Sequence, residues 1–164
     1  MERGFRGLYM IAIPLRNRSG EVIAKALIDD EDGLLARETW YLQKKGYATR
    51  QAPNSRKKLL LHRVILNAPP GVKVDHWNRD GLDCRRNNLR LATNAQNCQN
   101  RSLNSNNKAG YKGVRMDRGY WRATIRSKGK LIHLGLFKNV IDAAHAYDSA
   151  ATALFGKFAA PNFV

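Results

Sequence analysis

Residues 74–90 read VDHWNRDGLDCRRNNLR, and the organisation of the chain can be worked out from this segment. Asn, Asp and Gly residues crowd its middle, which is typical of the place where a hairpin reverses. The pair Asp75-His76 closes the first arm of this hairpin, and Asn88 opens the second. Thr93 then stands where a helix N-cap is expected, ahead of the Asn-rich residues 94–100. The segment therefore predicts a β-β-α unit.

The charge of the chain indicates its partner. Its 164 residues include 29 Lys+Arg and 13 Asp+Glu, which gives a net charge of +16 and a pI near 10.4. A folded, soluble protein is indicated, since 43% of the residues are hydrophobic and 26% are charged. So much positive charge on a short chain predicts binding to a polyanion, because phosphate contacts release counterions. Nucleic acid is the expected partner.

The hydropathy and the cysteines of the chain indicate where the protein resides. No apolar run reaches the ~20 residues that span a bilayer, and the N-terminus lacks a signal-peptide core, so a cytoplasmic protein is expected. Cys84 and Cys98 are the two cysteines, and no CxxC spacing occurs. The nearest imidazoles, His62 and His76, do not lie at finger spacing. Both cysteines are therefore predicted to be small, semi-buried residues in a reducing compartment.

The first 66 residues carry strand patterns with two ambiguous clusters. Strands are predicted at 9–14, 21–29, 40–42 and 47–49. The acidic residues 29–32 suit either a metal or the start of a short helix, and the helix is favoured because acids complement the helix dipole. The apolar run 59–66 is a strand or a short helix. Its His62 is either a buried structural histidine, which is favoured, or a residue that points into a site.

The last 55 residues predict three antiparallel strands covered by a helix. Residues 120–126 alternate, with Trp121, Ala123 and Ile125 on one face. Residues 131–137 alternate again, with Ile132, Leu134 and Leu136 expected on one face and His133 and Gly135 opposite. A third strand is expected at 113–116. The helix begins after Asn139, carries one apolar stripe and ends near Gly156; the stripe is Val140, Ala144, Tyr147, Ala151 and Leu154.

The motifs of this C-terminal region resemble the Apetala-type (ethylene-response-factor-like) DNA-binding domain over residues 110–163. They are GYKGVR at 110–115, WRATIR at 121–126, LGLF at 134–137, AAHAYD at 143–148 and Asn162-Phe163. The resemblance implies a basic sheet face that enters the DNA major groove. The implied DNA-binding residues are Lys112, Arg115, Tyr120, Arg122, Thr124 and Arg126. Thr124 and His133 depart from the family pattern, so base preference does not carry over.

Residues 62–101 resemble the HNH endonucleases of phage and intron homing type. The matching motifs are LHR at 61–63, VDH at 74–76, GLD at 81–83, RNNLR at 86–90 and residues 93–97. The resemblance implies that His76 is the general base and that Asn88 orients it. It implies Asp75 and Asn97 as metal ligands, with Asn94 as a competitor to Asn97. Oxygen ligands favour Mg²⁺, with Mn²⁺ as the alternative.

The sequence thus predicts an α+β protein. The expected parts are a supporting N-terminal segment at 1–58, an HNH core at 59–101, a linker at 102–109 and a DNA-binding domain at 110–164. The predicted function is a metal-dependent, site-selective DNA endonuclease of the homing type. As a monomer or weak dimer on double-stranded DNA, it would nick one strand per active site. The alternatives are a DNA-binding regulator with an inactive core and an RNA-binding structural protein.

Overall fold

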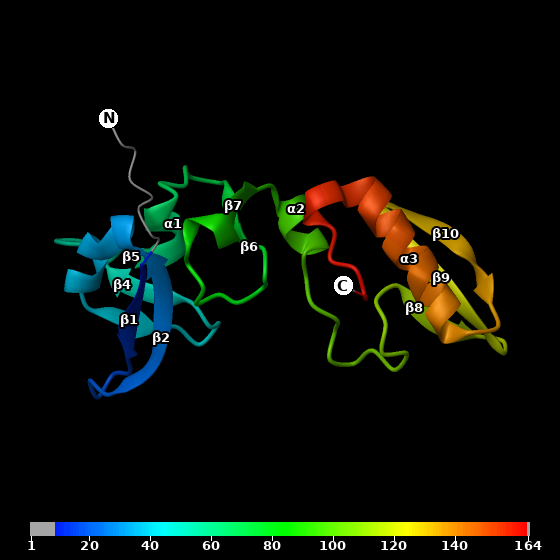
Figure 1. Ribbon diagram of the computed structural model, residues 1–164, viewed down its shortest axis with the longest axis horizontal. Coiled ribbons are helices and arrows are strands. Elements are labelled where there is room, and N and C mark those ends of the chain that lie inside the picture. The colour runs from blue at the N-terminus through cyan, green and yellow to red at the C-terminus, as the bar shows by residue number, and fades with distance from the viewer. Residues whose placement is uncertain (1–8, 164) are drawn as a thin grey trace. The chain divides into compact units, whose positions relative to one another are not determined.

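The computed structural model describes residues 9–163 and has the predicted α+β architecture (Figure 1). The chain folds as two compact units, Met1–Asn94 and Ala95–Val164. Within the described residues, no helix is both long and apolar enough to cross a bilayer.

The first unit is built on a five-stranded sheet with strand order β2-β1-β3-β4-β5. Ile13 and Leu15 are fully buried on one side of β1, because alternate residues of a strand face the same way. Trp40 is buried with them and donates its indole N–H to Leu35 O at 2.8 Å. The strands are β1 (Met10–Arg16), β2 (Val22–Asp29), β3 (Trp40–Leu42), β4 (Ala48–Gln51) and β5 (Lys58–Leu60). β1 pairs with β3 in parallel, and the other neighbours are antiparallel.

The ambiguous apolar run forms both elements considered for it. β5 runs directly into α1 (Leu61–Ile65), whose first and last residues are buried in the core. Arg63 of this helix fixes the loop that follows, because its guanidinium donates to Ala68 O at 3.0 Å and Val72 O at 2.5 Å. The helix therefore sets where the next strand begins.

The predicted hairpin consists of β6 (Lys73–His76) and β7 (Leu89–Ala92), with His76 opposite Leu89. Val74 and Leu89 join the same core as the five-stranded sheet. The loop between the arms is tied to β2: Leu27 N donates to Leu82 O, and Cys84 N donates to Leu27 O, both at 2.8 Å. The sheet and the hairpin therefore stabilise one another.

The acidic cluster at residues 29–32 has a second role besides starting a helix. Asp30, Glu31 and Asp32 do begin a short helix, η1 (Asp30–Arg37), although it is a 3-10 helix. Asp32 also pairs with the Arg86 guanidinium at 2.8 and 2.9 Å, and Asp29 accepts the Arg86 N–H at 2.7 Å. Arg86 lies in η2 (Arg86–Asn88), at the start of the second arm. The acidic cluster therefore holds the hairpin, an ion-pair role that sequence spacing does not reveal.

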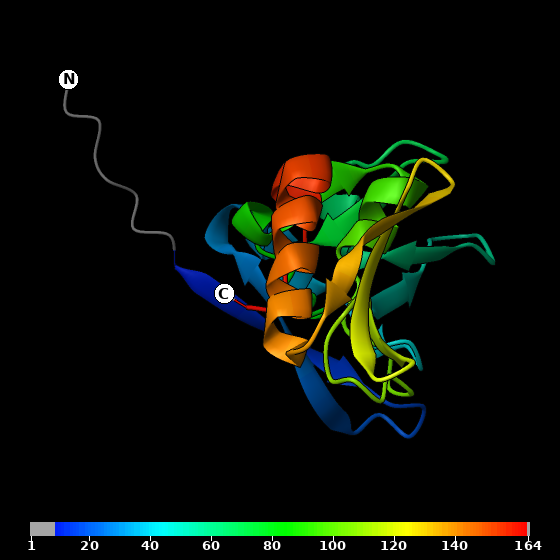
Figure 2. The same ribbon diagram turned by 90° about the vertical axis from the view of Figure 1, so that its right-hand side faces the viewer.

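The second unit has the predicted three-stranded antiparallel sheet, in the order β10-β9-β8, with α3 along one face (Figures 1 and 2). Small side chains let the helix lie close: Ala123 of the sheet and Ala143 and Ala144 of the helix are fully buried. Asn139 caps α3 by accepting the Ile141 N–H at 2.8 Å. The elements are α2 (Asn94–Gln99, at the unit boundary), β8 (Val114–Asp117), β9 (Tyr120–Ser127), β10 (Lys130–Phe137), α3 (Val140–Phe155) and η3 (Gly156–Phe158).

Two apolar assignments in this unit were wrong. The pairing of β10 with β9 slips between His133 and Gly135, so that Leu136 lies opposite Arg122 and is 52% exposed. A β-bulge of this kind reverses which face each later residue occupies, and Leu136 therefore leaves the face predicted for it. Leu154, at the end of the predicted helix stripe, is 46% exposed.

Candidate active site and nucleic-acid interface

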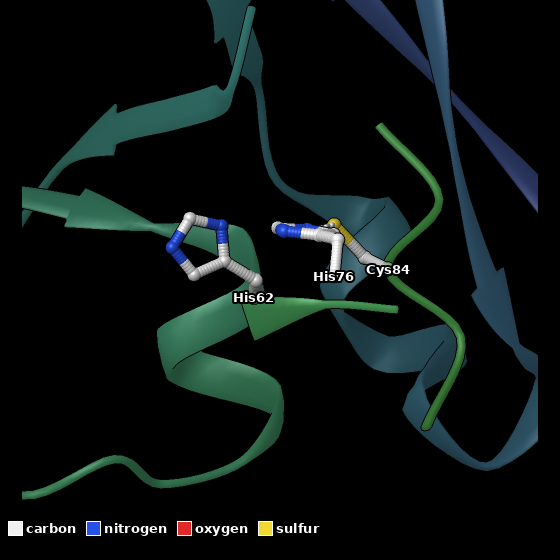
Figure 3. Close-up of side chains that lie close together, drawn as sticks. All are labelled: His62, His76 and Cys84. Carbon is white, nitrogen blue, oxygen red and sulfur yellow. Dashed lines mark hydrogen bonds between the residues drawn. The ribbon is translucent and has the colours of Figure 1, made fainter. Parts of the chain in front are cut away.

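His62, His76 and Cys84 meet in the interior of the first unit (Figure 3). The two imidazole centroids are 4.9 Å apart with an interplanar angle of 84°. The Cys84 sulfur lies 4.0 Å from His76 Nε2. The Tyr47 ring packs against both imidazoles, at 5.1 Å from His62 and 5.8 Å from His76. His62 is therefore buried, as a structural histidine would be, and it also points toward His76. Both interpretations of His62 apply.

Each member of this cluster comes from a different element. His62 is the second residue of α1, and His76 is the last residue of β6. Cys84 lies in the hairpin loop, which approaches the turn before β4. A Cβ at Gly81 would lie 2.6 Å from Gly46 O and 2.9 Å from the Tyr47 ring, so this approach requires glycine. Cys84 is buried, whereas Cys98 is exposed, contrary to the prediction that both would be semi-buried.

The groups in this cluster are uncharged near neutral pH. Burial is the main cause that lowers the pKa of His62, to about 3. Burial also lowers the pKa of His76, although Asp75 and other nearby carboxylates oppose it. Burial raises the pKa of the Cys84 thiol to about 12. A neutral imidazole can accept a proton, which is what a general base must do.

Asp75 precedes His76 on β6 and is only 5% exposed. Arg90 lies opposite it on β7. The Arg90 side chain donates from Nε to Asp75 Oδ2 at 2.7 Å, and its Nη2 lies 2.6 Å from the same oxygen. The hairpin register thus places a guanidinium against the carboxylate and balances its charge inside the fold.

Asn88 is buried at the start of the second arm and holds the loop that follows His76. Its Oδ1 accepts the Asn78 N–H at 2.9 Å, and its Nδ2 donates to Asp83 O at 2.7 Å. Its backbone O accepts the Trp77 N–H at 2.9 Å. These bonds act on the backbone directly after His76, which agrees with an orienting role.

The sheet face opposite α3 in the second unit is basic. Arg115 and Arg122 lie opposite one another on β8 and β9, and Arg122 pairs with Asp117. Thr124 lies opposite His133, and the exposed Arg126 donates to Gly129 O at 3.2 Å. Tyr120 is 45% exposed at the end of the same row. We call Arg115, Tyr120, Arg122, Thr124 and Arg126 the basic face.

Residues 60–99 match the family model described as HNH endonuclease. An uncharacterised HNH endonuclease of Acanthamoeba polyphaga mimivirus is 34% identical to this chain over 140 residues, covering 81% of the chain and 71% of that protein. The chain belongs to the HNH endonuclease family. The resemblance inferred from the hairpin motifs is therefore confirmed.

The C-terminal region of this HNH protein is similar to a second kind of protein. The dehydration-responsive element-binding proteins 2A of Oryza sativa subsp. indica and subsp. japonica are each 44% identical to it over 61 residues. Those residues make up 35% of this chain and 22% of each rice protein. This similarity over 61 residues confirms the Apetala-type resemblance of the C-terminal region.

The HNH family implies a divalent metal, and the first unit offers two sets of candidate donors for one. The Asp75 carboxylate is the hard oxygen ligand that Mg²⁺ or Mn²⁺ prefers. It lies beside His76, so a metal bound to it would be next to the general base. Its Oδ2 also accepts a hydrogen bond from Arg90. The His62, His76 and Cys84 side chains are nitrogen and sulfur donors, which suit a different class of metal. Asp75 thus fits a hard cation.

Asn97 and Asn94 lie on the HNH helix, α2. Asn94 is exposed and Asn97 is half-buried. The unit boundary falls within this helix, after Asn94, so Asn97 belongs to the second unit and Asp75 to the first. The assignment of Asn97 as second ligand, with Asn94 as competitor, stays a prediction.

Lys112 makes its hydrogen bonds to the C-terminal segment. Its Nζ donates to Ala160 O and its backbone N–H to Asn162 Oδ1, both at 2.6 Å. Asn162 is in turn held by the Asp148 carboxylate at 2.7 and 2.9 Å. Lys112 therefore anchors the C-terminal segment in this structure, and its role in DNA binding stays a prediction.

A second basic surface was missed in the sequence. A groove of about 780 Å³ opens on the five-stranded sheet, where β1, β3, β4 and β5 bring separate cations together. One of these cations, Arg50, pairs with Glu38 at 2.5 Å. No single stretch of sequence marks the groove, because its cations come from β1, β4 and β5 and from three turns between strands. They are Arg16, Arg18, Lys44, Arg50, Arg56 and Lys58.

We expect the first unit to lose stability as the pH falls below 6.5. Folding lowers the pKa of His62 from 6.5 to about 3. Between these values unfolded His62 binds a proton that folded His62 does not, so the free energy of unfolding falls by up to ~1.4 kcal/mol per pH unit. Above pH 6.5 this contribution is fully present. Urea unfolding with EDTA, from about pH 7 to pH 5, measures the slope.

The fluorescence of a Trp121→Phe protein would report this unfolding, because Trp40 and Trp77 both lie in the first unit. His62→Gln should flatten the slope, since glutamine does not titrate. His133→Gln, at an exposed position of the second unit, is the matched control and should leave the slope unchanged. An unchanged slope in His62→Gln would contradict the prediction.

Proposed function

We propose that this protein is a metal-dependent, site-selective DNA endonuclease of the homing type. The observation that carries the proposal is the neutral, buried His76 beside Asp75 at the end of β6, in a chain of the HNH family. His76 takes the proton of the attacking water, which the lowered pKa of its imidazole permits near neutral pH. His62 and Tyr47, packed on its ring, hold it in place.

Asp75 would hold the metal, with Mg²⁺ the expected ion, and Asn97 is the second ligand that the family resemblance implies. A divalent cation bound there would stabilise negative charge on the phosphate and on the leaving oxygen. Arg90 keeps the Asp75 carboxylate in position across the hairpin. Asn88 fixes the backbone after His76 by bonding to Asn78 and Asp83. In this proposal His76 accepts the proton, Asp75 and Asn97 are the metal ligands, and Arg90 and Asn88 orient the site.

Double-stranded DNA is the proposed substrate. The net charge of +16 supports a polyanionic partner. The similarity to dehydration-responsive element-binding proteins supports DNA binding by the second unit through the basic face. The basic groove of the first unit supports phosphate contacts along the five-stranded sheet. The second unit would then set where the cut falls.

Incubation of supercoiled plasmid DNA that carries a target site with the protein and Mg²⁺ tests the proposal. Such a site is first selected from a DNA library by sequencing the ends of cleaved fragments. We expect nicked circles first and linear DNA only later or at high protein concentration, since one active site attacks one strand. No nicking with Mg²⁺ or Mn²⁺, together with tight binding to the same DNA, would favour a regulator with an inactive core. Tighter binding to RNA than to duplex DNA would favour an RNA-binding protein.

A further inference from the structure

The His62, His76 and Cys84 cluster has the donors of a transition-metal site. The ligand atoms of the three side chains all lie within 4.8 Å of one another. Figure 3 shows the two imidazoles turned toward each other, with the Cys84 sulfur beside His76. The three residues are between 0% and 6% exposed, so solvent does not occupy this space freely.

One atom of the cluster indicates that a ligand belongs there. Among the described residues, His62 Nδ1 is buried without a hydrogen-bond partner. A buried polar atom left in this way costs ~1–3 kcal/mol, and nearly all such atoms in folded proteins are satisfied. Packing alone explains the burial of His62 but not the unsatisfied nitrogen. A bound cation would supply the missing partner.

We propose that His62, His76 and Cys84 form a binding site for Zn²⁺, and that zinc bound there holds the nuclease inactive. The inhibition by zinc rests on the proposed function, because it requires that His76 is the general base. An imidazole nitrogen that coordinates zinc cannot accept a proton from water. The Cys84 proton leaves to solvent when its sulfur binds the metal.

The chemistry of the donors selects the metal. Two imidazoles and a thiolate are ligands that Zn²⁺ prefers, whereas Mg²⁺ prefers oxygen. Tetrahedral Zn–N bonds of ~2.0–2.1 Å and Zn–S bonds of ~2.3 Å place the ligand atoms roughly 3.3–3.6 Å apart. The present sulfur-to-Nε2 distance is 4.0 Å. All three ligand atoms lie within 4.8 Å of one another. A contraction of at most about 1.5 Å would therefore complete three of the four tetrahedral positions.

The first experiment measures binding without any DNA. The chain has two cysteines, so a Cys98→Ser protein carries Cys84 as its only thiol. Titration with Co²⁺ is expected to give a thiolate-to-cobalt absorption band that saturates at one ion per chain. Zn²⁺ should displace the cobalt and remove the band. Absence of this band in the folded Cys98→Ser protein would overturn the zinc site.

Variants assign the ligands. Cys84→Ala in the Cys98→Ser background should lose the band, and His62→Ala should weaken Co²⁺ binding by at least about tenfold, as loss of a metal contact does. His133→Ala, which removes an exposed histidine, is the matched control and should bind as the parent does. A variant that fails to fold would not affect the result for the Cys98→Ser protein itself. Equal binding by folded His62→Ala would remove His62 from the site.

The second experiment measures inhibition of Mg²⁺-supported nicking. Zn²⁺ should inhibit the Cys98→Ser protein near equimolar concentration. The additional Cys84→Ala change should raise the required zinc concentration at least about tenfold. If nicking occurs but zinc inhibits both proteins equally, the inhibitory mechanism is wrong. If no protein nicks DNA under any condition, the proposed function fails, and the cobalt spectrum still decides the metal site.

Discussion

Replacement of His76 by alanine is expected to reduce DNA nicking by ~10²–10⁴-fold, the usual contribution of a general base. The loss should appear in the rate of the chemical step, because the imidazole that accepts the water proton is gone. Affinity for the same DNA should change little, since the buried side chain contributes no charge to the basic face or the basic groove. Single-turnover nicking and a binding titration at one salt concentration would separate the two effects.

His145→Ala is the matched control for this experiment, because it removes an exposed histidine of α3, which covers the sheet face opposite the basic face. Its cleavage rate is expected to stay close to that of the parent. Since His76 packs against His62 and Tyr47, circular dichroism and thermal unfolding should accompany the assay. A folded His76→Ala protein that nicks DNA at the parental rate would show that the base lies elsewhere.

The largest effect on DNA binding is expected from loss of three cations on the basic face. A protein with Arg115, Arg122 and Arg126 all changed to alanine should bind duplex DNA on the order of 100-fold more weakly near physiological salt. Each lost phosphate contact should lower the slope of log affinity against log salt by ~0.9, so the slope should fall by roughly 2–3. Affinity measured at four or five salt concentrations gives both quantities.

A second triple variant separates the position of the charges from their number. Lys25, Arg37 and Lys138 are exposed cations outside the basic face, and their change to alanine removes the same total charge. We expect this protein to retain most of its affinity and its salt slope. If both triple variants lose affinity and slope equally, binding depends on net charge and the basic face is not a specific surface.

The hairpin and the C-terminal sheet were predictable because their information is local. A strand end before a turn rich in Asn, Asp and Gly predicts a hairpin, and β6 and β7 follow it. Alternation at 120–126 likewise placed Ala123 and Ile125 in the core. Leu136 was misplaced because a bulge changes the register after His133, and nothing in the alternation of apolar residues signals that change.

The site was only partly predictable. Asp75, His76 and Asn88 lie close in sequence, and the resemblance of this stretch to HNH endonucleases indicated all three. The contacts around them come from further away: Tyr47 packs on His76 from the turn before β4, and Arg86 is held by acids in β2 and η1. Sequence spacing also argued against a metal site for the cysteines, because none of the familiar ligand spacings is present.

The sequence by itself determined the α+β class, the order of the elements, the HNH membership and the excess of positive charge. These follow from local periodicity, short motifs and composition, which do not depend on how distant segments meet. Only the tertiary structure decided that His62, His76 and Cys84 face one another, and that six cations from three strands and three turns line one groove. The shared core of sheet and hairpin brings α1, β6 and the hairpin loop to one point, and a contact between residues so far apart along the chain leaves no periodic trace in the sequence.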